Sequence, residues 1–219
     1  MKTIEIFKIR YTDINMSEDI VPMVRGYFAN KYIEIDNMHN HHGDKYIYRY
    51  PDIQYKIIEN NPVIIGINQG ANILKNKNIF NEDTIKIGNR EITSTQRKIV
   101  SKNAQIGISK DIKKYKFITP WVSLNQKNIK KYNKADIIEK NDLLEKIIIG
   151  NILSLSKGLN YTVEEEIRVK LELEEIKVNL KGIDMIGFKG YFYVNFEIPN
   201  DLGIGKSISR GFGTIKKVG

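Results

Sequence analysis

The order of strands and helices along residues 2–92 constrains the fold of this chain more than any other feature. The stretch KTIEIFKIRYTD at residues 2–13 is dense in Ile, Phe and Tyr, which is typical of a strand. A helix is expected to start at Ser17, because Ser is a favoured N-cap residue. Apolar residues then recur at the helical spacing i, i+3, i+4, i+7 and i+8, namely Ile20, Met23, Val24, Tyr27 and Phe28.

Four more elements follow this first strand and helix. Strands are expected at 45–58 and 62–67, a short helix at 68–76 and a further strand at 83–92. The resulting order, β-α-β-β-α-β, is that of the ferredoxin-like fold.

The second half of the chain reads as a variation on the first. A strong helix is expected at 137–157, where Ile137, Leu144, Ile148 and Leu155 form one stripe. The strand-like stretches lie on either side of it, at 113–124, 167–173, 176–181 and 190–198. No second helix is apparent here, so this copy of the fold is expected to be degenerate.

We therefore predict an α+β protein of two tandem ferredoxin-like (RRM-like) domains. The first spans residues 1–100, and the second spans residues 110–219 and ends in a glycine-rich loop and a short strand. The polar stretch at 93–112 is interpreted as the linker between them.

Composition narrows the function. The 35 Lys and Arg against 26 Asp and Glu give a formal net charge of +9, which favours nucleic acid as the partner, although an Ile-, Lys- and Asn-rich composition also produces many lysines. The absence of cysteine excludes thiol catalysis and disulfides and fits a reducing compartment. With neither a signal-peptide pattern nor an apolar run of about 18 residues, we expect a cytoplasmic protein without a membrane partner.

All three histidines of the chain fall within four positions, at His39, His41 and His42. Histidine acts as acid or base near neutral pH, so a pair suits phosphodiester cleavage. If residues 39–41 are extended, His39 and His41 point the same way with Cα atoms about 6.6 Å apart, and His42 points the other way. On the strand that follows, Tyr46, Tyr48 and Tyr50 alternate in the same manner.

Two other readings of the histidines stay open. His-x-His is also a metal-binding spacing, and Asp36 or Asp44 can supply the third ligand that zinc would need. A solvated polar loop can also carry three histidines without using them.

The segment GIGKSISRGFG at 203–213 looks like a nucleotide-binding loop but lacks its requirements. Its Gly-Lys-Ser has Asn200 where a P-loop needs its first glycine, and the following TIKKVG is too short and β-like for the required helix. We favour a backbone nest that contacts a sugar-phosphate chain, against a wide turn as the alternative. The residues expected to bind RNA are Gly203, Gly205, Lys206, Ser207, Ser209 and Arg210.

A second cationic cluster follows Trp121 in the stretch WVSLNQKNIKKYNK. Phosphate contacts are assigned to Lys130 and Lys131, with Lys127 and Lys134 beside them. A solvated loop explains the same lysines equally well.

Three segments together resemble a known family. GIGKSISRGFG near the C-terminus resembles the glycine-rich loop of the CRISPR repeat-cleaving endoribonucleases, which process precursor CRISPR RNA. TPWVSLN at 119–125 and YIYRYPDIQYKIIENNPVIIGI at 46–67 are similar to stretches of its archaeal and clostridial branch. The resemblance touches both halves of the chain.

The resemblance implies metal-independent RNA cleavage with no cofactor, giving a 5′-hydroxyl and a 2′,3′-cyclic phosphate or 3′-phosphate. It implies that His39 and His41 are catalytic and that a tyrosine on the next strand takes part, with Tyr48 the better match and Tyr46 the next. The implied partner is CRISPR repeat RNA. A homodimer and a loose association with an interference complex stay open.

Two alternative functions remain at this point. One is a non-catalytic RNA-binding subunit of a CRISPR interference complex, which has no need of a histidine pair. The other is a small metal-dependent hydrolase, which would carry stoichiometric metal.

Overall fold

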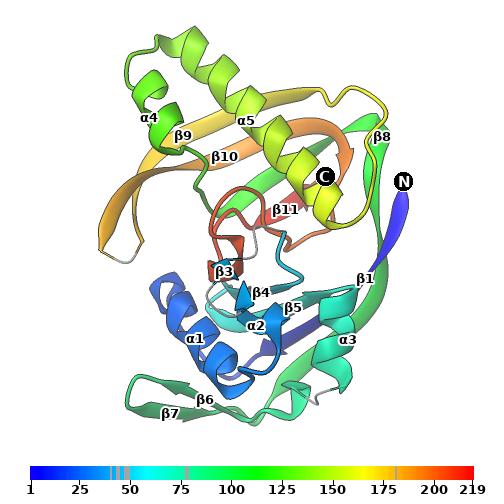
Figure 1. The fold of residues 1–219 in the computed structure, drawn as a ribbon, viewed down its shortest axis with the longest axis vertical. Helices are drawn as coiled ribbons and strands as arrows, with labels where there is room; N and C mark the ends of the chain where they lie inside the picture. The colour runs from blue at the N-terminus through cyan, green and yellow to red at the C-terminus, as the bar shows by residue number, and fades with distance from the viewer. Residues whose placement is uncertain (40, 43–44, 47–49, 77–78, 181) are drawn as a thin grey trace. The chain divides into compact units, whose positions relative to one another are not determined.

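The computed structural model divides into two compact units (Figure 1). It describes residues 1–39, 41–42, 45–46, 50–76, 79–180 and 182–219. The N-terminal unit is Thr3–Ala104 with Ser209–Gly211. The C-terminal unit is Met1–Lys2, Gln105–Ile208 and Phe212–Gly219. Among the described residues, no helix has the length and apolar character that a membrane crossing requires.

The N-terminal unit has the predicted order β-α-β-β-α-β. Its sheet runs β4-β5-β1-β8, and β5 pairs antiparallel with both β4 and β1. The elements that make this order are β1 (Lys2–Tyr11), α1 (Val21–Lys31), β4 (Ile53–Ile58), β5 (Asn61–Ile67), α3 (Gln69–Asn76) and β8 (Arg97–Trp121).

Two insertions interrupt this order. Between α1 and β4 lie the short α2 (Asp36–His39), β2 (His41–His42) and β3 (Lys45–Tyr46). Between α3 and β8 lie the 3-10 turn η2 (Ile79–Asn81) and the strands β6 (Thr84–Ile87) and β7 (Arg90–Thr93).

The expected strand at 83–92 and the expected linker at 93–112 are both wrong. Residues 84–93 form the β6–β7 hairpin, which is a separate two-stranded sheet. The chain reverses between its strands at Gly88, which has φ of 59°. From Arg97 onward the supposed linker is part of the 25-residue strand β8, which provides the last strand of the first fold and the first strand of the second. The polar residues at the start of β8 gave no strand pattern in the sequence, because strands pair through the backbone and tolerate exposed polar side chains.

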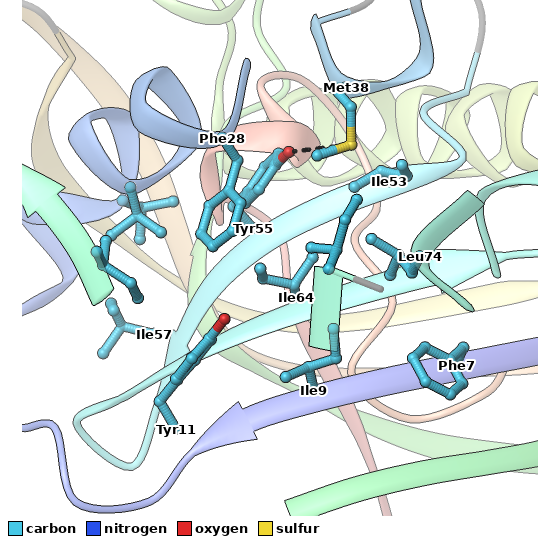
Figure 2. Close-up of a cluster of buried hydrophobic side chains, with 14 of the residues drawn as sticks. Phe7, Ile9, Tyr11, Phe28, Met38, Ile53, Tyr55, Ile57, Ile64 and Leu74 are labelled. Atoms are coloured by element: carbon cyan, nitrogen blue, oxygen red, sulfur yellow. Dashed lines mark hydrogen bonds between the residues drawn. The ribbon is translucent and has the colours of Figure 1, made fainter. Parts of the chain in front are cut away.

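The core of the N-terminal unit lies on one face of its sheet (Figure 2). Ile9 pairs with Ile64, and Ile64 pairs with Tyr55, so all three side chains share that face. Residues of both helices pack on the same face, among them Val24 and Phe28 of α1 and Ala71 and Leu74 of α3. Both helices therefore cover one side of the sheet.

The C-terminal unit repeats the arrangement, but the expectation that it lacks a second helix is wrong, because the seven-residue α4 precedes the long helix α5. Its sheet runs β9-β10-β8, and β11 also pairs with β8. Residues 198–214, all described, contain only the 3-10 turn η3 (Ile208–Arg210) as a helical element. The other elements are α4 (Gln126–Tyr132), α5 (Ile137–Gly158), β9 (Val169–Leu180), β10 (Ile183–Glu197) and β11 (Ile215–Val218). The two strands expected at 167–173 and 176–181 are the single strand β9.

Aromatic rings fill the space between this sheet and α5. Phe117 contacts Phe192 across the β8–β10 pair at 5.0 Å between ring centroids and stacks on Trp121 at 5.5 Å. Trp121 Nε1 donates to Asn151 Oδ1 of α5 at 3.1 Å. The stripe of α5 is correct at Leu144, Ile148 and Leu155, which are buried, but wrong at Ile137, which is exposed at the start of the helix.

The N-terminus of α5 carries a capping box. The Asp136 carboxylate accepts from Glu139 N at 2.9 Å, and the Glu139 carboxylate accepts from Asp136 N at 3.1 Å. Asp136→Ala should destabilise the C-terminal unit by about 1 kcal/mol, because the amide of Glu139 in the first turn loses its acceptor. Urea unfolding followed by the fluorescence of Trp121 measures this directly, since the indole is bound to α5. The control is Asp142→Ala, at an exposed position on the same helix; equal midpoints for the two variants would contradict the prediction.

Candidate functional site

The histidine cluster lies in the insertion between α1 and β4. His39 is the last residue of α2, and His41 lies in β2 opposite Tyr46 of β3. Tyr48 lies outside the described residues. His39 is thus helical, so the condition of an extended backbone, under which His39 and His41 would point the same way, is not met at His39.

Two contacts of the N-terminal unit fix α2 just before His39. Asn37 Nδ2 donates to Asp52 Oδ2 at 2.8 Å. Met38 is buried, and its Sδ accepts from the Tyr55 hydroxyl at 3.7 Å (Figure 2). Burial raises the pKa of Tyr55, so its hydroxyl keeps its proton and acts as the donor. The helix α2 is therefore anchored through the two residues that precede His39.

The same tyrosine supports residues from the far end of the chain. Gly211 has φ of 88°, and a methyl group there would lie 3.3 Å from the Val21 side chain and 3.5 Å from the Tyr55 carbonyl oxygen. Ser209 and Arg210 precede Gly211 and belong to the N-terminal unit with it. The structure thus brings Ser209 and Arg210 against α1 and β4, where Tyr55 also anchors α2.

A second arginine, which the sequence analysis missed, shares this region. Arg25 lies one helical turn after Val21 on α1. Its pKa is lowered, mainly by burial and then by the positive charge of Arg210. Arg25 and Arg210 therefore affect each other electrostatically. Such a pair of guanidinium groups suits a bound phosphate, because Arg presents a fork of donors that matches phosphate oxygens. The sequence signal that could have identified Arg25 is a cation placed beside the apolar residues Val21 and Val24 of α1.

The first part of the glycine-rich segment belongs to the C-terminal unit and has structural duties there. Gly205 has φ of 100°, and a methyl group there would lie 2.6 Å from Trp121 Nε1. Lys206 Nζ donates to the Leu124 carbonyl at 3.0 Å, and burial lowers the pKa of Lys206. The structure therefore gives Gly205 and Lys206 packing roles that the sequence analysis did not foresee. Gly203 is bridged to Thr214, and Ser207 has φ of 55°.

Lys130 and Lys131 occupy the last turn of α4 and are exposed. Cations are favoured there by the helix dipole, and Asn125 caps the other end by accepting from the amides of Lys127 and Asn128. Their placement suits both a phosphate contact and a solvated helix end, so the RNA-binding role of these lysines stays a prediction.

Comparison with known proteins settles the family. The Cas6b N-terminal domain model matches residues 2–105, and the Cas6b C-terminal domain model matches residues 107–218. The chain belongs to the Cas6b family. The resemblance inferred from the sequence is thereby confirmed.

Three relatives illustrate the match. A crystal structure of Cas6b is 44% identical, with a TM-score of 0.96, over 99% of this chain and 100% of that one. A crystal structure of the CRISPR RNA processing endoribonuclease Cas6b is 41% identical, with a TM-score of 0.82 and the same coverage. An uncharacterised protein of Methanocaldococcus jannaschii is 51% identical over 115 residues, which are 52% of this Cas6b chain and 78% of that protein.

A more distant structure shows the fold alone. A Cas6 product complex has a TM-score of 0.61 at 10% identity, over the whole of both chains. Together with the two sheets described above, this likeness confirms the α+β, tandem ferredoxin-like architecture.

The packing of Gly205 generates a prediction for this Cas6b chain. Gly205→Ala should destabilise the C-terminal unit by at least about 1–2 kcal/mol, because a side chain at positive φ is strained and the added methyl group meets the Trp121 indole. Urea unfolding followed by Trp121 fluorescence measures the loss and the change in indole environment.

Gly150→Ala is the matched control. Gly150 lies inside α5 with open space around its Cβ position, so this change should stabilise the unit by about 0.5–1 kcal/mol. If Gly205→Ala left both the unfolding midpoint and the emission spectrum unchanged, the proposed packing role of Gly205 would be wrong.

Proposed function

We propose that this chain is an endoribonuclease that cleaves precursor CRISPR RNA within its repeats. The observation that carries the proposal is the match of both Cas6b domain models along the chain. The relative described as a CRISPR RNA processing endoribonuclease supports it, being 41% identical over 99% of the chain.

The proposed reaction is a transesterification within the RNA. The 2′-oxygen of one ribose attacks the adjacent phosphorus, and the bond from that phosphorus to the 5′-oxygen of the next nucleotide breaks. One base takes the proton from the 2′-hydroxyl, and one acid gives a proton to the leaving 5′-oxygen. The products are a 2′,3′-cyclic phosphate and a 5′-hydroxyl, and the reaction balances without a metal or a co-reactant.

His39 and His41 are proposed as the acid and the base. Each proton transfer is typically worth about 10²–10⁴-fold in rate, and imidazole serves either role near neutral pH. The contacts of Asn37 and Met38 anchor the helix α2 that ends at His39. A tyrosine is proposed to hold the reacting phosphate or nucleophile, with Tyr48 the better match to the family resemblance and Tyr46 the next.

The substrate is proposed to be held chiefly through its phosphates. The net charge of +9 supplies the attraction. Arg210, which lies in the unit that carries the histidines and whose positive charge lowers the pKa of Arg25, is proposed to contact a phosphate. Binding of this kind positions the RNA and loses affinity as salt rises.

Cleavage of a cognate repeat RNA in excess EDTA tests the reaction. The wild-type protein should cleave at an unchanged rate, and the double variant His39→Ala/His41→Ala should lose at least about 100-fold. A substrate with a single 2′-deoxy nucleotide at the cut should stay intact, because the nucleophile is missing. His42→Ala is the matched control and should cleave normally.

Each alternative has its own result in this experiment. Loss of cleavage in EDTA with recovery on adding Mg²⁺, Mn²⁺ or Zn²⁺ would replace the proposal by a metal-dependent hydrolase. Tight, salt-sensitive binding without product in any buffer would replace it by a non-catalytic RNA-binding subunit. Comparison of Tyr46→Phe with Tyr48→Phe then assigns the tyrosine.

The phosphate site of Arg210 has a separate test. Arg210→Ala should weaken binding of all RNA sequences alike and lower the slope of log K against log salt by about 1, because one phosphate contact is lost. Binding titrations at several salt concentrations measure this slope. Arg90→Ala, at an exposed position on β7 of the same unit, is the control and should keep the wild-type slope. An unchanged slope for Arg210→Ala would rule out the contact.

A further inference from the structure

The sheet of the C-terminal unit has one face that its helix does not cover. Helix α5 crosses one face of this sheet (Figure 1). Along β10 the side chains alternate: Phe192 and Val194 are buried on the core face, and Tyr191 and Tyr193 lie on the opposite face. Both tyrosines are only partly buried. We call this opposite face, with its two tyrosines, the tyrosine face.

The residues of β10 around these tyrosines follow a sequence pattern known from RNA-binding sheets. The ribonucleoprotein motif of RRM domains reads Lys/Arg-Gly-Phe/Tyr-Gly/Ala-Phe-Val-x-Phe/Tyr. Residues 189–196 read Lys-Gly-Tyr-Phe-Tyr-Val-Asn-Phe and depart from it only in Phe192, for Gly or Ala, and in Tyr193, for Phe. Phe192 points into the core, so that departure leaves the exposed face unchanged. β10 is also the third strand of its fold, between β9 and β8.

The second residue of the motif has a structural reason here. Gly190 has φ of 126°, and a methyl group there would collide with the Glu172 carbonyl of β9. The glycine therefore lets β9 come close to β10 beside the two tyrosines. This close pairing holds the ring-bearing part of β10 in the middle of the sheet.

Lysines surround the rings on the same face. Tyr193 pairs with Lys114 of β8 and Lys170 of β9, and Tyr191 pairs with Lys116. Lys116 also pairs with Lys216 of β11. Two aromatic rings on this face are thus accompanied by Lys114, Lys116, Lys170 and Lys216, with Glu172 opposite Tyr191 and Glu174 one pair further along, opposite Lys189. Aromatic platforms with cations around them are the chemistry of single-stranded nucleic-acid binding.

A hollow adjoins the second ring. A cavity of about 480 Å³ beside Tyr193 falls within the range of small-molecule sites. Cationic and apolar groups line it, with a single acid: Ile112, Arg168, Val169, Lys170, Glu172 and Tyr193. A base stacked on Tyr193 would have room for its sugar and phosphate next to two cations.

The contacts already made by the rings do not close the face. The Tyr193 hydroxyl donates to Glu172 Oε2 at 2.9 Å, which engages the edge of the ring. Lys114 Nζ lies 4.4 Å from the Tyr191 centroid and 5.1 Å from that of Tyr193. At exposed sites such a cation–π contact is worth about two- to fivefold in an equilibrium, whereas a stacked base is worth about five- to 150-fold. RNA can therefore displace the ammonium group, which then pairs with a phosphate.

We propose that the tyrosine face binds two successive unpaired nucleotides of the RNA, with one base stacked on Tyr191 and the next on Tyr193. The four lysines hold the phosphates between and beside them. This inference rests on the proposed function for the identity of the ligand as RNA. The N-terminal sheet offers no equivalent, because the described residues of its strand β5 from Pro62 to Ile67 are buried.

Fluorescence anisotropy with a labelled, unstructured single-stranded RNA tests the proposal. The double variant Tyr191→Ala/Tyr193→Ala should bind at least about fivefold more weakly, since base–aromatic stacking is lost. The double variant Tyr191→Phe/Tyr193→Phe should bind like the wild type, because Phe keeps the stacking surface. Binding of a fully paired RNA duplex should be the same for all three proteins, since its bases are not free to stack.

Tyr27→Ala is the matched control for loss of a tyrosine. Tyr27 also has a lysine over its ring, with Lys31 Nζ 5.7 Å from the centroid, but it belongs to α1 of the N-terminal unit. This variant should bind single strands as the wild type does. Unfolding followed by Trp121 fluorescence establishes that the tyrosine variants retain the fold of the C-terminal unit.

Cleavage and binding fail separately, which keeps this inference distinct from the proposed function. Equal affinity of the Ala pair and the wild type for the single strand, or equal weakening for the duplex, overturns the tyrosine face whatever the cleavage result. Absence of cleavage by the wild type overturns the proposed function and leaves the binding comparison to decide the tyrosine face.

Discussion

The two-residue repeat of β10 is the constraint on which the C-terminal unit depends. Phe192 reaches Phe117 across the strand pair and Tyr115 at 5.2 Å between ring centroids, and these contacts fix the register of β10 on β8. A slip of one residue would bury Tyr191 and Tyr193 and expose the phenylalanines. The same packing therefore sets both the core under α5 and the aromatic surface on the other side of the sheet. In the N-terminal unit Tyr55 has the comparable position, since its ring stacks on Phe28 and its hydroxyl holds Met38.

Much of the fold followed from periodicity. The helical spacing in α1 and the apolar strands β1, β4 and β5 gave the β-α-β-β-α-β order, because each element buries a face that its sequence marks. The polar strand β8 and the β6–β7 hairpin could not be predicted in this way. β8 is stabilised by backbone pairing with strands from both halves of the chain, which leaves little trace in its own side chains.

The candidate site could be predicted only at its histidines, because histidine is a rare residue in this chain. Three histidines within four positions drew attention to α2 and β2 without any knowledge of the fold. Arg25 was missed because its partner in space, Arg210, lies 185 positions away in the sequence. Lys206 was assigned to phosphate on composition, and its bond to the Leu124 carbonyl depends on a turn that no local pattern specifies.

The segment Ser209–Gly211 has a consequence for how such a chain can change in evolution. These residues follow Ile208 and precede Phe212 of the C-terminal unit, yet they pack on Val21 and Tyr55 of the other unit. Joining the first half of one relative to the second half of another, at the boundary near residue 105, would import this segment from the wrong parent. Recombination at that point therefore succeeds only between parents whose α1 and β4 surfaces accept the same three residues. The halves resemble separate modules in their strand order, but a change in one half has to remain compatible with the packing of Gly211 on Val21 and Tyr55.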